Sequence, residues 1–203
     1  MAMAMTKGKV PMVTLADDVP GPQQGYWTYE DYAAIPDDGR RYEILGGVLY
    51  MSPSPSERHQ GIGNLLAYYL TTHVQLAGLG RVYSAPLDVE LSPRDVVQPD
   101  VFVILNANRE KITPLRIVGA PDLAIEILSP GSVARDYREK MDAYAQAGAP
   151  EYWIVNPDAR TIEVFALENK RYRSLGAFEG PAKLPSRVVP DFPVQVKQFF
   201  DQD

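Results

Sequence analysis

The sequence predicts an α/β fold in which a mixed β-sheet is flanked by two helices. Two long segments have the apolar spacing of helices, and short strand-like segments lie before, between and after them. One strand, within Pro121–Pro130, is apolar on both faces, as expected for a strand in the middle of a sheet. The helix after it can cross over to the next strand, so we expect parallel as well as antiparallel pairs.

The composition is that of a globular protein with a core. The chain has 203 residues, and 45% of them are hydrophobic. It contains no run of 18 or more apolar residues, so no membrane span is expected. Cysteine is absent, which excludes disulfides and thiolate metal sites and fits a reducing cytoplasm. We therefore expect a cytoplasmic protein.

The N-terminal part is expected to form an arm and a small extension. Residues 1–25 are rich in proline and glycine and lack periodicity, which predicts a flexible arm before a single domain over residues 26–203. Tyr26–Tyr32 predicts a short helix with Thr28 as its N-cap. Arg41–Met51 predicts a hairpin, because strand-like residues flank a Gly-Gly pair that suits a two-residue turn.

The remaining elements follow in order. The long helices are expected over Glu57–Ala77, where Ser56 can cap the start, and over Val133–Ala147, which Gly148 ends. A strand with a bend near Pro86 is expected before the second helix, because proline interrupts strand pairing. The predicted strands are Arg81–Leu91, Val101–Leu105, the strand within Pro121–Pro130, Glu151–Val155, Thr161–Leu167 and Arg171–Leu175.

The central strand carries a carboxylate where apolar residues are expected. Glu126 lies between Ile125 and Ile127, and an unpaired buried carboxylate costs several kcal/mol. Glu126 must therefore be protonated, paired or bound to a metal ion. Asp100 begins the neighbouring predicted strand, and two carboxylates from adjoining strands are typical of a hard-cation site.

Magnesium is the cation that this arrangement suits. It keeps several waters, so Asp100, Glu126 and the backbone carbonyl of Ile127 can suffice as protein ligands. Lys140 lies on the helix after the central strand, where its ammonium group could orient an attacking water or neutralise a phosphate.

These residues belong to a longer set of motifs. The motifs are Tyr42-Glu43-Ile44, Gly46-Gly47, Met51-Ser52-Pro53, His59-Gln60, Gln98-Pro99-Asp100, Pro121–Pro130, the trio Asp136, Lys140 and Tyr144, and Glu151–Pro157. Taken together they resemble the Uma-type restriction endonuclease family, a branch of the PD-(D/E)XK nuclease superfamily. The resemblance extends from about Trp27 to Phe165.

The resemblance implies a restriction-endonuclease-like mixed sheet flanked by helices, with the hairpin and short helix as an N-terminal extension. It implies endonucleolytic hydrolysis of DNA that depends on Mg²⁺, with Mn²⁺ as a substitute. Asp100 and Glu126 would hold the metal, and Lys140 would position the nucleophile or offset charge. Glu43 would be an outer ligand or proton acceptor, and His59 would orient Glu43 or contact phosphate.

One departure concerns the signature lysine of the superfamily, which lies two residues after the acidic residue. Leu128 occupies that position, and the resemblance implies that Lys140 replaces it. Structural alternatives remain for each residue: Asp100 as a turn cap, Glu126 paired only with Lys140, Lys140 paired with Asp136 on a solvated face, Glu43 exposed on the hairpin, and His59 as a packing residue.

Three functions are compatible with these observations. The first is a DNA endonuclease, with a basic rim predicted at Arg94, Arg109, Lys111, Arg116, Arg135 and Arg138. The second is a catalytically inactive nuclease-fold module for binding or assembly, which the net charge of −6 and the absent lysine at position 128 favour. The third is a metal-dependent hydrolase of another substrate. A homodimer is expected, because the aromatic N-terminal segment needs a surface to cover.

Overall fold

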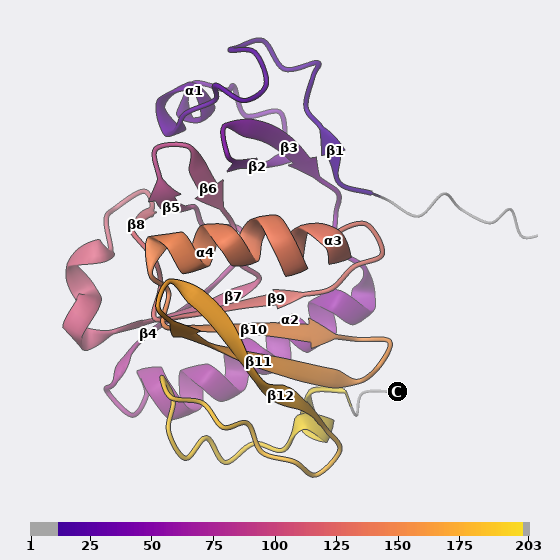
Figure 1. Cartoon of the computed structure of the whole chain (residues 1–203), viewed down its shortest axis with the longest axis vertical. Helices are drawn as coiled ribbons and strands as arrows, with labels where there is room; N and C mark the ends of the chain where they lie inside the picture. Colours follow the sequence, from indigo (N-terminus) through magenta and orange to yellow (C-terminus); the bar gives the residue numbers. More distant parts are fainter. Residues whose placement is uncertain (1–11, 201–203) are drawn as a thin grey trace, which may run out of the picture.

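The computed structural model describes residues 12–200 and contains two six-stranded sheets (Figure 1). The predicted mixed α/β architecture with flanking helices is confirmed, whereas a second sheet was not predicted. Residues 1–11 of the expected arm lie outside the described residues. Further along the arm, β1 (Thr14–Leu15) pairs with β3 (Val48–Ser52). Within residues 12–200, no helix combines the length and apolar content needed to cross a bilayer.

The larger core surrounds the sheet ordered β12-β11-β10-β9-β7-β4. The strand β9 is central: it pairs in parallel with β10 and antiparallel with β7, so the sheet is mixed as predicted. These strands are β4 (Gly80–Ser84), β7 (Val101–Leu105), β9 (Leu123–Ile127), β10 (Glu151–Asn156), β11 (Thr161–Glu168) and β12 (Arg171–Glu179).

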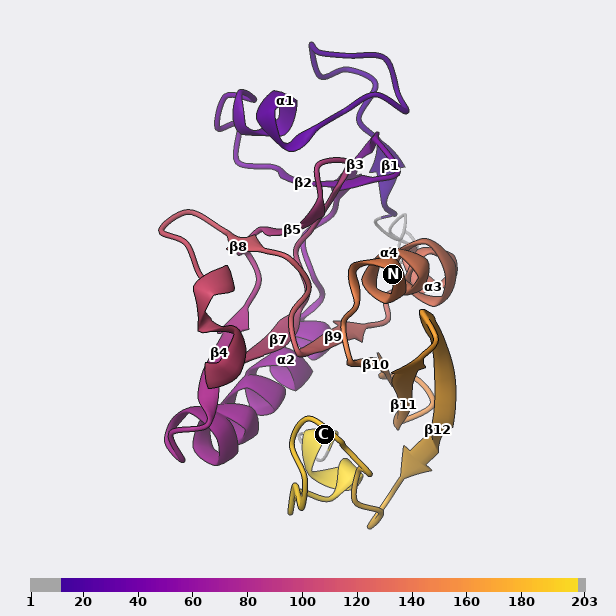
Figure 2. The same ribbon diagram turned by 60° about the vertical axis from the view of Figure 1, so that its left-hand side comes forward.

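Both faces of β9 are buried, as its sequence predicts. Leu123, Ile125 and Ile127 pack in the core beneath α2 (Glu57–Leu70), whereas Ala124 and Leu128 pack in the core on the opposite face. The second core includes Tyr144 of α4 (Met141–Ala147). Figures 1 and 2 show α2 and α4 on opposite sides of this sheet. Glu126 alternates with Ile125 and Ile127 and therefore points to the side of α4.

The second sheet, ordered β1-β3-β2-β6-β5-β8, contains the predicted hairpin. The hairpin consists of β2 (Arg41–Leu45) and β3 (Val48–Ser52). Besides β1, the other strands of this sheet are β5 (Val89–Ser92), β6 (Asp95–Val97) and β8 (Ile117–Val118). The segment predicted as one bent strand over Arg81–Leu91 is divided between the sheets, as β4 and β5. Pro86 lies between the two strands and has no amide hydrogen to donate to a ladder.

The predicted helix starts are confirmed. Thr28 caps α1 (Tyr29–Ala33) by accepting from the amide of Asp31 at 3.4 Å, and Ser56 caps α2 by accepting from the amide of His59 at 3.2 Å. Both long helices also contain π-helical turns that the sequence does not predict. These turns are η1 (Thr71–Gln75) after α2, and η3 (Asp136–Lys140) between α3 (Val133–Arg135) and α4. Two 3₁₀ segments complete the described chain, η2 (Asn106–Lys111) and η4 (Val196–Phe199).

A buried carboxylate fixes the C-terminal segment to β10. Glu151 is fully buried; one oxygen accepts from the Trp153 indole and the Ser186 hydroxyl, both at 2.6 Å. The other oxygen accepts from the amides of Arg187 at 2.6 Å and Val188 at 3.3 Å. Four donors thus converge on two acceptor atoms.

We expect Glu151→Gln to lower the free energy of unfolding by about 2 kcal/mol, because the new amide group cannot accept from the two backbone N–H groups. Urea denaturation measures the change. Glu168→Gln is the matched control, since Glu168 makes only exposed ion pairs at 3.3 and 3.7 Å and should change stability by less than about 1 kcal/mol. Equal losses in the two variants would contradict the structural role of Glu151.

Candidate active site

A cavity of about 640 Å³ lies where the hairpin of the second sheet faces the start of α2 and the segment after β9. Its wall is mostly apolar and contains several prolines from the connecting loops. It is lined by the five side chains singled out from the sequence, which are Glu43, His59, Asp100, Glu126 and Lys140. Ile127 lines it as well. The structure therefore brings the predicted residues together in one place.

The two predicted metal ligands come from adjacent antiparallel strands. The register that pairs Val101 of β7 with Ile125 of β9 continues to place Asp100 opposite Glu126. Asp100 Oδ2 accepts from the amide of Ile127 at 2.7 Å, which joins the start of β7 to the end of β9. Asp100 is thus neither a simple turn cap nor a solvated residue, since its side chain is 14% exposed.

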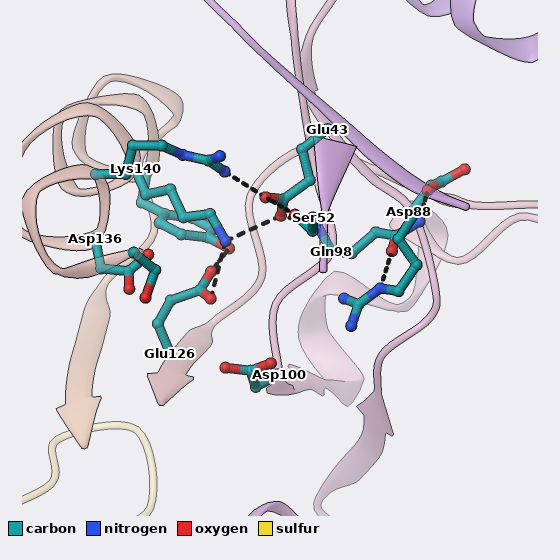
Figure 3. A network of polar contacts seen from close by, with 12 residues as sticks. Glu43, Ser52, Asp88, Gln98, Asp100, Glu126, Asp136 and Lys140 are labelled. Carbon is teal, nitrogen blue, oxygen red and sulfur yellow. Dashed lines mark hydrogen bonds and ion pairs between the residues drawn. The ribbon is translucent and has the colours of Figure 1, made fainter. Parts of the chain in front are cut away.

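Lys140 lies between two buried carboxylates. Its ammonium nitrogen is 2.9 Å from Glu43 Oε1 and 3.0 Å from Glu126 Oε2, and its side chain is 7% exposed. Figure 3 shows these contacts on opposite sides of the ammonium group. The inward orientation predicted for Lys140 is correct, and the alternative pair with Asp136 on a solvated face is not formed. Tyr144, one helical turn further on, donates its hydroxyl to Glu126 Oε1 at 2.9 Å.

Glu43 connects the hairpin to this helix. It accepts from the amide of Gln98 at 2.9 Å and from Arg135 Nη2 at 2.6 Å, besides its contact with Lys140. Burial alone would raise the pKa of Glu43, but the charges of Lys140 and Arg135 outweigh it and lower the pKa to about 2. Glu43 is therefore an ionised, fully engaged carboxylate and not an exposed hairpin residue.

His59 pairs with Asp100 rather than with Glu43, which corrects one of the roles expected for it. Its Nε2 lies 3.2 Å from Asp100 Oδ2. Burial lowers the pKa of His59, but the hydrogen bond and charge of Asp100 outweigh that effect and raise it. The imidazole therefore fixes the orientation of the Asp100 carboxylate from the start of α2.

Comparison with known proteins places the chain in a family. The family model described as "Uma2: Putative restriction endonuclease" matches residues 29–197, most of the chain. The chain belongs to the Uma2 family. The resemblance inferred from the motifs is thereby confirmed.

The Uma2 chain also has the fold of a solved structure. It is similar to the crystal structure of a protein from Anabaena variabilis ATCC 29413, described as "a putative nuclease belonging to DUF820". The TM-score is 0.70 at 21% sequence identity, and the match covers 85% of this chain and 97% of the other. This likeness concerns the fold. No curated protein matches the chain.

The cavity of this Uma2 protein carries more acidic than basic groups. Five carboxyl groups line it, against four permanent cations. The acids are Glu43, Asp100, Glu126, Asp136 and Asp158, and the cations are Lys140, Arg135, Arg41 and Arg58, of which Arg58 pairs with Asp158. Burial raises the pKa of Glu126 well above its usual range; Lys140 opposes the shift, and the charge of Asp100 adds to it. Burial likewise raises the pKa of Asp136 to about 6. The buried acids around Lys140 thus repel one another, and a cation would relieve that repulsion.

The donor set fits a magnesium ion with few protein ligands. Within residues 12–200, no group of three or more His, Asp or Glu side chains has the arrangement of a metal centre. Magnesium, however, commonly uses one or two carboxylates and takes its other ligands from water and phosphate. Asp100 and Glu126, with the carbonyl of Ile127, supply such a set.

The predicted basic rim contributes little to the lining of the cavity. Of its six members only Arg135 lines the cavity, and Arg135 is buried. Three others have structural partners: Lys111 donates to the carbonyl of Ala120, Arg116 pairs with Glu90, and Arg94 donates to the carbonyls of Gly25 and Gly46. The guanidinium of Arg135 lies 4.5 Å from the centre of the Tyr50 ring, where it supports Glu43.

Two contributors to the site were not identified from the sequence. Arg135 was assigned to the surface, because nothing in its local pattern shows that Glu43 lies opposite. Tyr144 belongs to the motif set, but neither the motifs nor the resemblance gave it a role at Glu126. The spacing of four residues between Lys140 and Tyr144 could have indicated that both reach Glu126.

Proposed function

We propose that this protein is a magnesium-dependent nuclease that hydrolyses phosphodiester bonds of DNA. The observation that carries the proposal is the meeting of Asp100 and Glu126, from adjoining strands, with the ammonium group of Lys140 in one cavity. Membership of the Uma2 family, whose model describes a restriction endonuclease, supports the same reaction class. The reaction adds water to phosphorus, breaks one bond between phosphorus and a sugar oxygen, and leaves a proton on that oxygen.

Asp100, Glu126 and the Ile127 carbonyl are the groups that would hold the metal. A divalent cation at such a site lowers the pKa of water and offsets the negative charge that develops on phosphate. The protein supplies the orientation of the ligands. His59 and the Ile127 amide fix Asp100, whereas Lys140 and Tyr144 fix Glu126.

Lys140 acts as a fixed positive charge. Burial would lower its pKa, but Glu126 and Glu43 outweigh that effect and raise it above the usual value, so the amine stays protonated at neutral pH. It therefore cannot accept a proton from water. Its positive charge can balance the phosphate, while Glu43, which also pairs with Arg135, holds its position.

One observation favours the alternative of an inactive nuclease-fold module that binds without cleaving. Both predicted ligands already have protein partners: Glu126 contacts Lys140 and Tyr144, and Asp100 contacts His59 and the Ile127 amide. Groups of the chain itself therefore already contact both carboxylates. Cleavage and binding must therefore be measured separately.

A plasmid nicking assay tests the proposal. We expect the wild-type protein to nick or linearise plasmid DNA with Mg²⁺ or Mn²⁺ and to be inactive with a chelator, and Glu126→Ala to lose activity at every metal concentration. Glu110→Ala is the control, since Glu110 is an exposed acid outside the cavity. Equal activity in Glu126→Ala and wild type would reject the site and indicate a contaminant. DNA binding without cleavage by the wild type would support the inactive module.

A further inference from the structure

The two terminal nitrogens of the Arg41 guanidinium have no hydrogen-bond acceptor in the described chain. Arg41 begins β2 and lines the cavity, and its Nε donates to Gln98 Oε1 at 3.0 Å. Within residues 12–200, no acceptor or ion-pair partner contacts its two terminal nitrogens. These nitrogens are also not sealed from solvent, because the buried unpaired nitrogens in that range belong to Trp27 and Arg135. The Arg41 guanidinium is therefore partly buried and open to the cavity.

The other permanent cations of the cavity are committed to protein groups. Arg58 pairs with Asp158 at 3.2 Å and donates to the carbonyl of Pro157 at 2.6 Å. Arg135 pairs with Glu43, and Lys140 pairs with Glu43 and Glu126. The unpaired Nη1 of Arg135 is buried away from solvent. Among the described lining residues, Arg41 is thus the guanidinium whose two terminal nitrogens are both unpaired and open to solvent.

The chain holds Arg41 in place through Gln98, which is 7% exposed. The Gln98 amide group donates to Asp88 at 2.9 Å, and Asp88 also accepts from the hydroxyl of Tyr32 at 2.9 Å. The backbone N–H of Gln98 donates to Glu43, so the same residue supports Arg41 and the lysine-binding carboxylate (Figure 3). Asp100 follows two residues later, and Arg41 lines the same cavity as the predicted metal ligands Asp100 and Glu126.

A positioned guanidinium with free terminal nitrogens is suited to a phosphate group. Its planar donors match two phosphate oxygens, and Arg is less strongly hydrated than Lys. Arg41 also lines the same cavity as Asp100 and its partner His59. An anion near Asp100 and Glu126 needs such a cation, because their carboxylates would otherwise repel it.

We propose that Arg41 binds a phosphate of the DNA substrate inside the cavity. This inference rests on the proposed function and adds a substrate-contacting residue to it. Neither the metal ligands nor the Lys140 ion pairs involve Arg41. Its contribution can therefore be measured by DNA binding without cleavage.

The test measures binding of a short fluorescein-labelled DNA duplex in Ca²⁺, over a series of salt concentrations. Arg41→Gln should weaken binding about tenfold and make the slope of log K against log salt shallower by about 1. Arg41→Lys keeps the charge but loses the planar donors, so it should weaken binding several-fold and retain the slope. Arg173→Gln on β12, where the side chain is 73% exposed, is the control and should bind as the wild type does.

The outcomes separate this inference from the proposed function. Unchanged affinity and salt slope in Arg41→Gln would overturn the inference, whether or not the wild type cleaves DNA. An Arg41-dependent slope in a protein that never cleaves with Mg²⁺ would support the inference and reject the nuclease. Absence of duplex binding by the wild type would overturn both. Thermal denaturation confirms folding of Arg41→Gln, and a misfolded Arg41→Gln leaves Arg41→Lys to decide: affinity equal to the wild type would overturn the inference.

Discussion

Lys140→Met is expected to lower the free energy of unfolding by about 3–5 kcal/mol at neutral pH. Lys140 is the cation nearest Glu126, at 3.0 Å, and it also contacts Glu43 at 2.9 Å. Its removal leaves Glu126 with the Tyr144 hydroxyl as its remaining partner, and burial already raises the pKa of Glu126. The variant must therefore tolerate a buried charge or bind a proton. Urea denaturation measures the loss.

Two further variants identify the cause of that loss. Lys197→Met removes an exposed lysine and should change stability by no more than about 0.5 kcal/mol. Adding Glu126→Gln to Lys140→Met removes the unpaired charge, so the double variant should lose less than the sum of the single changes, by about 1–3 kcal/mol. Strict additivity would show that the contact between Lys140 and Glu126 contributes nothing to folding.

The central strand and the buried acid could be predicted because their signals are local. Apolar residues on both faces of Leu123–Ile127 indicate a middle strand, and a carboxylate at the centre of such a strand requires a partner. The same reasoning places Asp100 beside Glu126, because consecutive strands of a sheet are usually neighbours. Lys140 was expected from its place on the helix after this strand, and the motif resemblance added Glu43 and His59. The structure places all three in the cavity.

The remaining features depend on contacts between distant segments. The second sheet forms because β5 and β6 pair with the hairpin and β8, and no local periodicity specifies those partners. The π-helical turn over Asp136–Lys140 likewise changes which side chains face inward. Val133, an apolar residue at the predicted start of this helix, is 43% exposed, whereas Asp136 and Arg135 are buried. A regular α-helical period does not predict this change in which side chains are buried.

Asp100→Asn should lower the rate of metal-dependent cleavage by roughly 10³-fold, since metal catalysis supplies several kcal/mol of transition-state stabilisation. It should also weaken Mn²⁺ binding, measured by calorimetric titration. The asparagine oxygen can still accept from the Ile127 amide, so the joint between β7 and β9 is retained. We therefore expect the metal-free variant to be at least as stable as the wild type, because one of the mutually repelling charges is gone.

Asp122→Asn makes this expectation decisive, because Asp122 is also a buried aspartate but lies outside the cavity. It accepts from the amide of Leu105 at 2.7 Å and from Asn108 at 2.6 Å, and it has no part in the proposed metal site. Asp122→Asn should lose stability and keep Mn²⁺ binding, the reverse of Asp100→Asn. Mn²⁺ at about 100 times its Kd should stabilise the wild type and Asp122→Asn by about 2.7 kcal/mol. The same stabilisation of Asp100→Asn would mean that the cation binds elsewhere, because a ligand stabilises only the folded state to which it binds.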